Sequence, residues 1–387
     1  MATESVIGPV RRAARAFAWL AASTAATALL GGCGGTSGVS ASDRAAQSPV
    51  SFDDYARLGY TLDWRTFPHV TPGERVEQVV FGDDTIAALE GGSFVTLMEA
   101  NDGSFRWRVG ISNSLAVFRD VEFHDSRLLV VGDADLYMLD LATGTIQERQ
   151  RFDPIANSPV VRSGDLLAYG ANSGQLVGHL TAGAGVKFWG HLMSGPISFA
   201  PVLFDADNGP AVMAASGEGS IVFATADRGR LLGRQRMFAG PGAQPVAGDG
   251  LVFIGSLDQS VYAFAPDESG PVWRHRTERP IESDPAYLDR VVYIELAEAG
   301  MTAFNADDGS ILWSNVNLRG SIIGTREGML VAWDEDRRVM RTVDASTGDA
   351  VETVSLPTIR WATIEPFENG DLFTLSDTEV LARFRGR

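Results

Sequence analysis

Cysteine and lysine are almost absent from this sequence of 387 residues, in which Cys33 is the only cysteine and Lys187 the only lysine. With a single cysteine no intrachain disulfide can form, so the fold must depend on burial and hydrogen bonding. The net charge of −17 at pH 7 makes nucleic acid an unlikely partner, because a phosphate backbone repels an acidic protein. No G-x-S-x-G motif is present, although a Ser-His-Asp triad can also assemble from residues that are distant in sequence.

Histidine is also scarce, and the five histidines are too far apart to show the spacing of metal ligands. They are His69, His124, His179, His191 and His275. Two acidic segments faintly resemble calcium loops, "FDADNG" (204–209) and "FNADDGSILW" (304–313), but turns between strands use the same letters. We expect no metal site and interpret both segments as hairpin turns. A third charged segment, "WDEDRR" (333–338), has a solvated turn as its simplest interpretation, and contact with a charged partner is the alternative.

The first 32 residues have the pattern of an export signal. Three arginines, Arg11, Arg12 and Arg15, precede a mostly apolar run from Ala16 to Leu30, which is too short to cross a bilayer as a helix. The run ends in "LLGGCGG", where Leu30 and two glycines precede Cys33. This arrangement resembles the lipobox of bacterial lipoproteins, in which the signal is cut before a cysteine that then becomes acylated. The resemblance implies a signal peptide at 1–32 and lipidation of Cys33, whereas the alternative is an ordinary signal peptide with an incidental cysteine.

Residues 33–54 follow as the lipidated cysteine and a flexible tether, since the stretch is rich in Gly and Ser and has no apolar period. Residue 34 is Gly rather than the Asp that retains many such lipoproteins at the inner membrane. By that resemblance we expect a protein of the bacterial cell envelope that is anchored through its N-terminal lipid, in the outer membrane and facing the periplasm.

A repeat with a period near 41 residues organises the rest of the chain. Glycines in similar turn segments follow one another at spacings of 41, 41, 44, 41, 39 and 39 residues, namely Gly103, Gly144, Gly185, Gly229, Gly270, Gly309 and Gly348. A strand of alternating polarity precedes each turn, a more continuous apolar strand lies before it, and four units begin at an X-Pro step (Pro159, Pro201, Pro245 and Pro285). Such a period predicts an all-β propeller whose blades have four short antiparallel strands.

The two ends of the repeat region complement each other. "YTLDWRTF" near residue 64 has the pattern of an outermost strand with no blade before it, and the C-terminal segment offers three strands. We therefore predict that residues 55–387 form eight blades and that the N-terminal strand completes the last one, which protects the sheet edges. Tryptophans recur at one phase of the repeat, Trp64, Trp107, Trp189, Trp273 and Trp313, and we expect them to dock each blade on the next.

An alternating strand followed by Asp-x-x-Thr-Gly-x-x-x-Trp, as in "MLDLATGTIQE" (138–148), resembles the pyrroloquinoline-quinone-type (PQQ-like) propeller repeat. One branch of that superfamily comprises dehydrogenases that bind the quinone and Ca²⁺ near a vicinal disulfide. This chain cannot form that disulfide, and its short units leave no room for the insertions that build a dehydrogenase pocket. We therefore expect no cofactor and no enzymatic activity, and consider a PQQ-dependent dehydrogenase the less favoured alternative.

The other branch comprises the lipoprotein propellers of the outer-membrane β-barrel assembly machinery, which have a lipobox, a tether and eight such blades. That resemblance implies a monomeric, non-catalytic scaffold in the periplasm that binds the barrel-assembling pore subunit through loops on one face of a few neighbouring blades. Another extracytoplasmic propeller, with a different protein client or a ligand, is the alternative. No partner-binding residue follows from the sequence.

Overall fold

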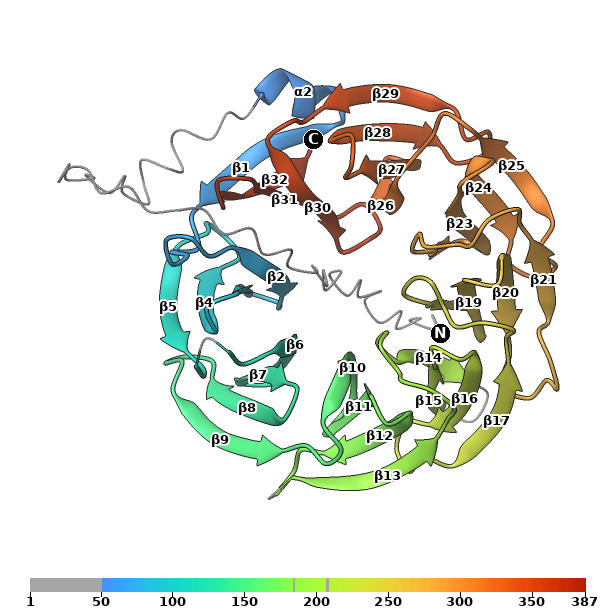
Figure 1. Ribbon diagram of the computed structural model, residues 1–387. Helices are drawn as coiled ribbons and strands as arrows, with labels where there is room; N and C mark the ends of the chain where they lie inside the picture. Colours follow the sequence, from blue (N-terminus) through green and yellow to red (C-terminus); the bar gives the residue numbers. More distant parts are fainter. Residues whose placement is uncertain (1–50, 114, 184, 207–208) are drawn as a thin grey trace, which may run out of the picture.

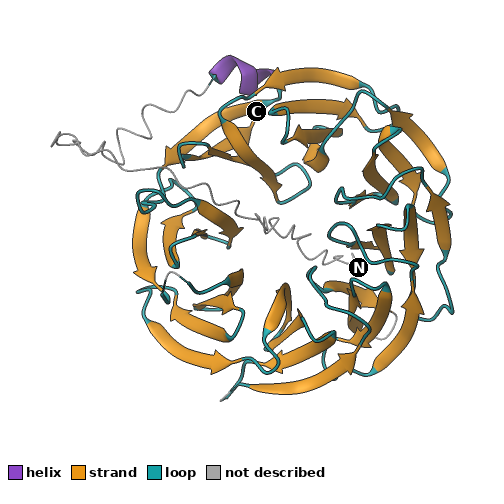
Figure 2. Cartoon of the chain, in the orientation of Figure 1, coloured by secondary structure: helices purple, strands orange, loops and turns teal. Residues whose placement is uncertain are grey.

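The computed structural model describes residues 51–387 except 114, 184 and 207–208. The predicted signal peptide, Cys33 and most of the predicted tether lie outside the described residues. Within the described part, eight four-stranded antiparallel sheets surround a common centre, as Figure 1 shows. Figure 2 shows that strands make up nearly all of this ring and that a short helix lies at its periphery.

The sheets are numbered here as blades 1 to 8 in chain order. The first four are blade 1 with β2 (Val76–Phe81), β3 (Thr85–Glu90), β4 (Phe94–Glu99) and β5 (Phe105–Gly110); blade 2 with β6 (Phe118–His124), β7 (Arg127–Gly132), β8 (Asp135–Asp140) and β9 (Ile146–Arg151); blade 3 with β10 (Ala156–Ser163), β11 (Leu166–Ala171), β12 (Gln175–Leu180) and β13 (Val186–Leu192); and blade 4 with β14 (Val202–Ala206), β15 (Gly209–Ala215), β16 (Ser220–Thr225) and β17 (Leu231–Arg236).

The other four are blade 5 with β18 (Val246–Gly248), β19 (Leu251–Ser256), β20 (Ser260–Phe264) and β21 (Trp273–Arg276); blade 6 with β22 (Ala286–Leu288), β23 (Val291–Leu296), β24 (Gly300–Asn305) and β25 (Ile311–Asn315); blade 7 with β26 (Ser321–Arg326), β27 (Met329–Asp334), β28 (Val339–Asp344) and β29 (Ala350–Ser355); and blade 8 with β30 (Ile359–Glu365), β31 (Asp371–Ser376), β32 (Leu381–Gly386) and β1 (Tyr60–Thr66). The predicted all-β, eight-bladed propeller is confirmed. In each blade the first strand lies innermost and the fourth outermost (Figure 1).

The N-terminal strand closes the ring, as predicted. β1 pairs antiparallel with β32, from Tyr60 opposite Gly386 to Thr66 opposite Leu381. Arg383 on β32 supports the closure, since its Nε lies 2.8 Å from Asp371 Oδ2 and its Nη1 donates to Ala100 O of blade 1 at 2.7 Å. The last blade is therefore made from both ends of the propeller and leaves no unpaired strand between them.

Burial explains why the second strand of a blade is a continuous apolar run. Every residue of β3 and of β11 is buried, because each blade lies between two others and both faces of the strand are covered. The apolar clusters accordingly lie between neighbouring blades. One cluster, for example, joins Leu97 and Trp107 of blade 1 to Val121 and Leu128 of blade 2.

Helix α2 (Phe52–Arg57) covers the outside of blades 7 and 8. Ser51 caps it by accepting a hydrogen bond from Asp54 N, and the ring of Tyr55 stacks on Phe384 with centroids 3.8 Å apart. Residues 52–54, which the sequence analysis assigned to the tether, thus belong to this helix. Within the described residues, no helix is long and apolar enough to cross a membrane.

Three of the four repeat prolines immediately precede innermost strands, namely Pro201, Pro245 and Pro285. Pro159 instead lies inside β10, at the irregularity where the register with β11 shifts between Ala156 and Val160. Both positions tolerate a residue without an N–H donor, because neither requires a ladder hydrogen bond there.

Candidate functional site

The repeat tryptophans contact the turn of the following blade. Their indole Nε1 donates to a main-chain carbonyl of that turn in four cases, Trp64 to Ala100 (3.0 Å), Trp107 to Leu141 (2.9 Å), Trp273 to Ala306 (2.7 Å) and Trp313 to Ala345 (2.9 Å). Trp189 packs on Gly229 in the same way, but its Nε1 has no acceptor among the described residues. These contacts join successive blades around the ring and do not converge on one pocket.

The turn glycines form the surface on which these indole rings pack. Gly103, Gly144, Gly229, Gly309 and Gly348 have positive φ, and a Cβ on any of them would come within 2.3–2.7 Å of the indole that packs on it. Glycine is thus required twice at these positions, by the left-handed backbone and by the close approach of the ring. Gly270, from the same sequence series, has open space around it.

Two glutamines replace tryptophan at the blade contacts of blades 2 and 4. Gln150 Nε2 donates to Thr181 O at 2.8 Å, and Gln235 Nε2 donates to Ala265 O at 2.5 Å. The sequence analysis missed both residues. Their position in the repeat could have indicated them. In blades 1, 3 and 6 tryptophan follows the turn glycine by four residues, whereas in these two blades glutamine follows it by six.

The segment "FNADDGSILW" forms the turn between β24 and β25. Asp308 Oδ1 accepts hydrogen bonds from the backbone and the hydroxyl of Ser310, at 2.9 and 2.7 Å, and these bonds hold the pKa of the Asp308 carboxyl below its usual range. Asp307 forms an ion pair with Arg290. Asp308 is therefore engaged within its own turn, and Asp307 is engaged with the β22–β23 turn of the same blade. "FDADNG" joins β14 to β15, with residues 207–208 outside the described part.

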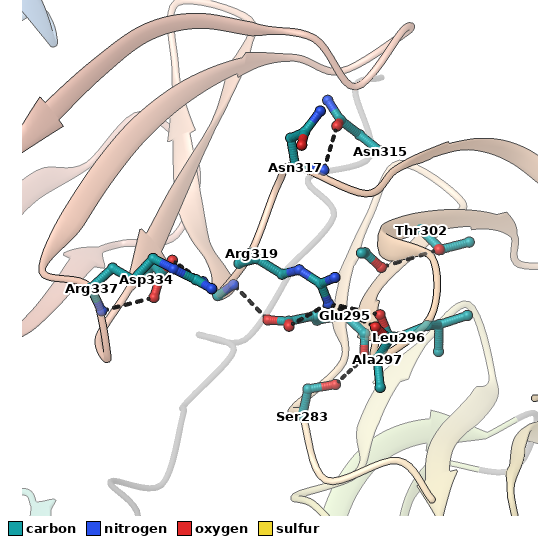
Figure 3. A network of polar contacts seen from close by, with 12 residues as sticks. Ser283, Glu295, Leu296, Ala297, Thr302, Asn315, Asn317, Arg319, Asp334 and Arg337 are labelled. Atoms are coloured by element: carbon teal, nitrogen blue, oxygen red, sulfur yellow. Dashed lines mark hydrogen bonds and ion pairs between the residues drawn. The ribbon is translucent and has the colours of Figure 1, made fainter. Parts of the chain in front are cut away.

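Figure 3 shows a polar network between blades 6 and 7. Glu295 accepts hydrogen bonds from Arg319 Nη1 (3.1 Å) and Gly320 N (2.6 Å), while Asp334 accepts from Arg337 Nη1 (3.0 Å). Asp334 is buried, whereas residues 335–337 of "WDEDRR" form the exposed β27–β28 turn. The network fixes the shape of this charged turn.

The histidines do not form a cluster. His179 is buried and its Nε2 lies 2.9 Å from Gln150 Oε1, and burial lowers its pKa to about 4. His124 contacts Asp165, and His191 contacts the carbonyl of Gly229. Across the described residues, no group of three or more histidine, cysteine, aspartate or glutamate side chains is placed to hold a metal ion.

A central cavity of about 2050 Å³ is lined by the innermost strands and the adjoining loops. Its walls are strongly acidic. The carboxylates are Asp120, Glu122, Asp205, Asp249, Glu282, Asp284, Asp289, Glu295, Asp334, Glu335, Asp336, Glu365 and Glu368, against Arg162, Arg290, Arg319 and Arg337. Such a cavity disfavours anionic ligands.

Exposed apolar side chains gather on one face of blades 3 to 5. Leu192 at the end of β13, Phe238 after β17 and Leu257 in the β19–β20 turn are 66%, 82% and 43% exposed. In a four-stranded meander these connections lie at the same end of the strands. We call these three residues the rim patch.

The most exposed member of the rim patch, Phe238, has polar neighbours at its backbone and at its ring. Phe238 N donates to Asp258 Oδ2 at 3.0 Å, and the guanidinium of Arg274 lies 5.0 Å from the centre of the Phe238 ring. Arg234 Nη1 donates to Leu192 O at 2.9 Å. The rim patch therefore places an exposed aromatic ring beside basic side chains on a protein whose net charge is −17.

Comparison with known proteins gives one family match and several structural ones. The family model described as outer membrane protein assembly factor BamB matches residues 55–256 and 217–363. The crystal structure of BamB from Moraxella catarrhalis is similar over 83% of this chain and 97% of its own, with 18% identity and a TM-score of 0.63. The computationally designed Ika8 protein is similar over 84% and 99%, with 11% identity and the same TM-score of 0.63. No curated protein sequence matches this chain. At these identities the structural likeness shows the shared fold alone.

Proposed function

Because this chain belongs to the family described as outer membrane protein assembly factor BamB, we propose that it is a non-catalytic scaffold in the assembly of outer-membrane β-barrel proteins. A propeller serves this role well, since it offers a rigid ring with loops on two faces. The chemistry of the described residues supports binding rather than catalysis, because the carboxylates of the turns and of the network between blades 6 and 7 are held by local partners.

The proposal includes the location of the protein. Cys33 carries the lipid anchor, residues from 34 onward form the tether, and the propeller faces the periplasm from the outer membrane. Gly34 supports sorting to the outer membrane by its resemblance to other lipoproteins. Several acyl chains on one cysteine would make the attachment effectively permanent. The propeller acts as a monomer at the end of this tether.

The rim patch is the observation that carries the proposal. The Phe238 side chain is 82% exposed, although Asp258 accepts a hydrogen bond from its backbone N–H and Arg274 lies beside its ring, so it contributes little to the stability of the free protein. Aromatic and arginine side chains are enriched in protein interfaces, and exposed apolar patches often mark such interfaces. We assign Phe238, Leu192 and Leu257 to the surface that binds the periplasmic part of the barrel-assembling pore subunit.

A pull-down of the full lipidated chain from its own envelope in mild detergent tests this assignment. We expect mass spectrometry to find the pore subunit with the wild-type chain, and its recovery to fall at least about tenfold with Phe238→Ala, the loss that truncation of an interface hot spot causes. Phe52→Ala is the matched control, because Phe52 is 62% exposed on α2, beside blades 7 and 8. Recovery of another envelope complex, or equal recovery with both variants, would overturn the assignment.

The acidic cavity supports a second candidate function, an extracytoplasmic propeller that binds a cationic ligand or another client. It does not fit a PQQ-dependent dehydrogenase, because pyrroloquinoline quinone carries several carboxylates and would meet acidic walls. An absorbance spectrum of the native protein together with metal analysis separates these functions. A quinone chromophore bound in stoichiometric amount would contradict the scaffold proposal.

A further inference from the structure

The outermost strands of blades 4 and 5 carry arginines and no acidic residue. Arg234 and Arg236 lie on β17, Arg274 and Arg276 lie on β21, and all four side chains are exposed. We call these four residues the arginine strip. A concentration of positive charge of this kind stands out on a protein whose net charge is −17.

Serine replaces a carboxylate next to the arginine strip. In blade 2 the residue opposite Arg151 is Asp135, whose Oδ2 accepts a hydrogen bond from Arg149 Nη2 at 2.7 Å. The residues at the position of Asp135 in blades 4 and 5 are serines, Ser220 and Ser260. A hydroxyl group cannot neutralise a guanidinium. In the part of the chain that the structure describes, no arginine of the strip forms an ion pair.

The arginine strip borders the rim patch. Arg234 Nη1 donates to Leu192 O at 2.9 Å, and the guanidinium of Arg274 lies 5.0 Å from the centre of the Phe238 ring. Arg236 and Arg276 follow two residues later on the same strands, and residues two apart on a strand point to the same side of the sheet. Positive charge and exposed apolar side chains thus form one continuous surface.

The acidic residues around this surface are fewer than its arginines. Asp258 accepts hydrogen bonds from neutral donors, one of them the hydroxyl of Tyr262 at 2.6 Å. Glu218 lies in the β15–β16 turn, and Glu278 follows β21 but is itself followed by Arg279. Three carboxylates therefore face five arginines when Arg279 is included, and the surface keeps a positive charge.

We propose that the arginine strip binds an acidic surface on the protein that docks on the rim patch. This inference rests on the proposed scaffold function and adds the charge of the partner to it. Complementary charges at the edge of an interface guide the partner to its site and exclude wrong partners. Exposed guanidinium groups beside an apolar patch have the arrangement of an apolar interface core with a polar rim.

The place of the arginine strip in the ring favours a protein over lipid headgroups. Helix α2, where the described chain begins, contacts β29 and β1 of blades 7 and 8, whereas β17 and β21 lie far from it in the ring (Figure 1). A tether that enters at α2 would bring blades 7 and 8 closest to a membrane. The arginine strip is then free to meet a protein partner.

Arg276→Glu in the full lipidated chain tests the proposal, because it reverses one charge of the strip and leaves the rim patch intact. In the mild-detergent pull-down at low salt, we expect recovery of the partner to fall at least about tenfold. Arg151→Glu is the matched control, since Arg151 is exposed at the same position of the repeat in blade 2, and it should lower recovery less than about twofold. High salt should weaken the wild-type complex and change that of Arg276→Glu much less.

The outcomes separate this inference from the scaffold proposal. Recovery of the pore subunit that neither salt nor Arg276→Glu changes would overturn the inference and leave the scaffold role in place. Recovery of a different identified protein with the salt and charge dependence described would support the inference and contradict the scaffold role. No recovery of any protein with the wild type would overturn both. Flotation with phosphatidylglycerol vesicles that only Arg276→Glu abolishes, with protein recovery unchanged, would assign the strip to lipid and overturn the inference.

Discussion

The indole of Trp107 lies directly on Gly144 of the next blade, and its Nε1 donates to Leu141 O at 2.9 Å. A Cβ on Gly144 would come within 2.7 Å of the ring, and φ at this position is 72°. The contact therefore depends on a residue without a side chain in a left-handed conformation. Equivalent pairs join other blades, so one local relationship repeats around the propeller.

Gly144→Ala should destabilise the protein by roughly 2–4 kcal/mol, because left-handed strain and overpacking against Trp107 add to each other. Denaturant unfolding measures the change. Gly164→Ala is the control, since Gly164 has a φ of 59° but nothing within 4 Å of the added methyl group. Its cost should be about 1 kcal/mol, that of the backbone alone. Equal losses in the two variants would contradict the role assigned to the tryptophan contact.

Gln150→Ala should cost roughly 2–3 kcal/mol, because it leaves the buried His179 without its partner and removes the hydrogen bond to Thr181 O. Gln147→Ala on the same strand is the control, since that side chain bonds Asp140 at the surface, and it should change the free energy of unfolding by less than about 0.5 kcal/mol. Chemical denaturation of both variants at pH 7.5 tests this. Similar values would mean that Gln150 does not replace tryptophan as a blade contact.

Acid should weaken the junction of blades 2 and 3 through His179. Burial lowers its folded pKa to about 4, so the unfolded chain takes up a proton first as pH falls. This contribution to stability is present above about pH 6.5 and is lost toward pH 4, by roughly 2–3 kcal/mol. The loss between pH 7.5 and pH 5 should be smaller in His179→Gln and unchanged in a variant of the exposed His69. The same slope in all three proteins would contradict the prediction.

Arg383→Met should destabilise the ring closure by about 1–3 kcal/mol, because Asp371 loses its partner and the carbonyl of Ala100 keeps only the hydrogen bond from Trp64 at the junction of blades 8 and 1. Arg385→Met is the control, since Arg385 is 55% exposed and pairs with Asp63 at 2.9 Å. An exposed pair of this kind contributes at most about 1 kcal/mol. A larger loss in the control would place the closing interaction elsewhere.

The repeat made the architecture predictable from the sequence, because a fixed spacing of turn glycines and tryptophans is imposed by the geometry of one blade against the next. The closure of the ring was predicted because each end of the repeat region holds only part of a blade, one strand at "YTLDWRTF" and three strands in the C-terminal segment. Helix α2 was missed because its six residues continue a Gly- and Ser-rich stretch and have only a capping Ser51 and one buried residue, Tyr55, to indicate it.

The site was less predictable, for physical reasons that differ between residues. Gln150 and Gln235 carry the blade contact at a shifted position, so an alignment on tryptophan passes over them. Phe238 lies in a loop between blades. The alternation of apolar and polar residues predicts burial only within strands, so it does not indicate whether a loop residue is exposed. Asp120 accepts hydrogen bonds from Gln78 Nε2 and from Val160 N, about 40 residues away on either side, and these contacts become visible only when the innermost strands are placed next to each other.

The most direct test of the central claim is photo-crosslinking in intact cells, with a photoreactive phenylalanine analogue at position 238 of the full lipidated chain. The scaffold account predicts one main crosslinked product that contains the barrel-assembling pore subunit, and none of it when the analogue is placed at position 52. Crosslinks from position 238 only to other envelope proteins, or equal products from both positions, would contradict the account.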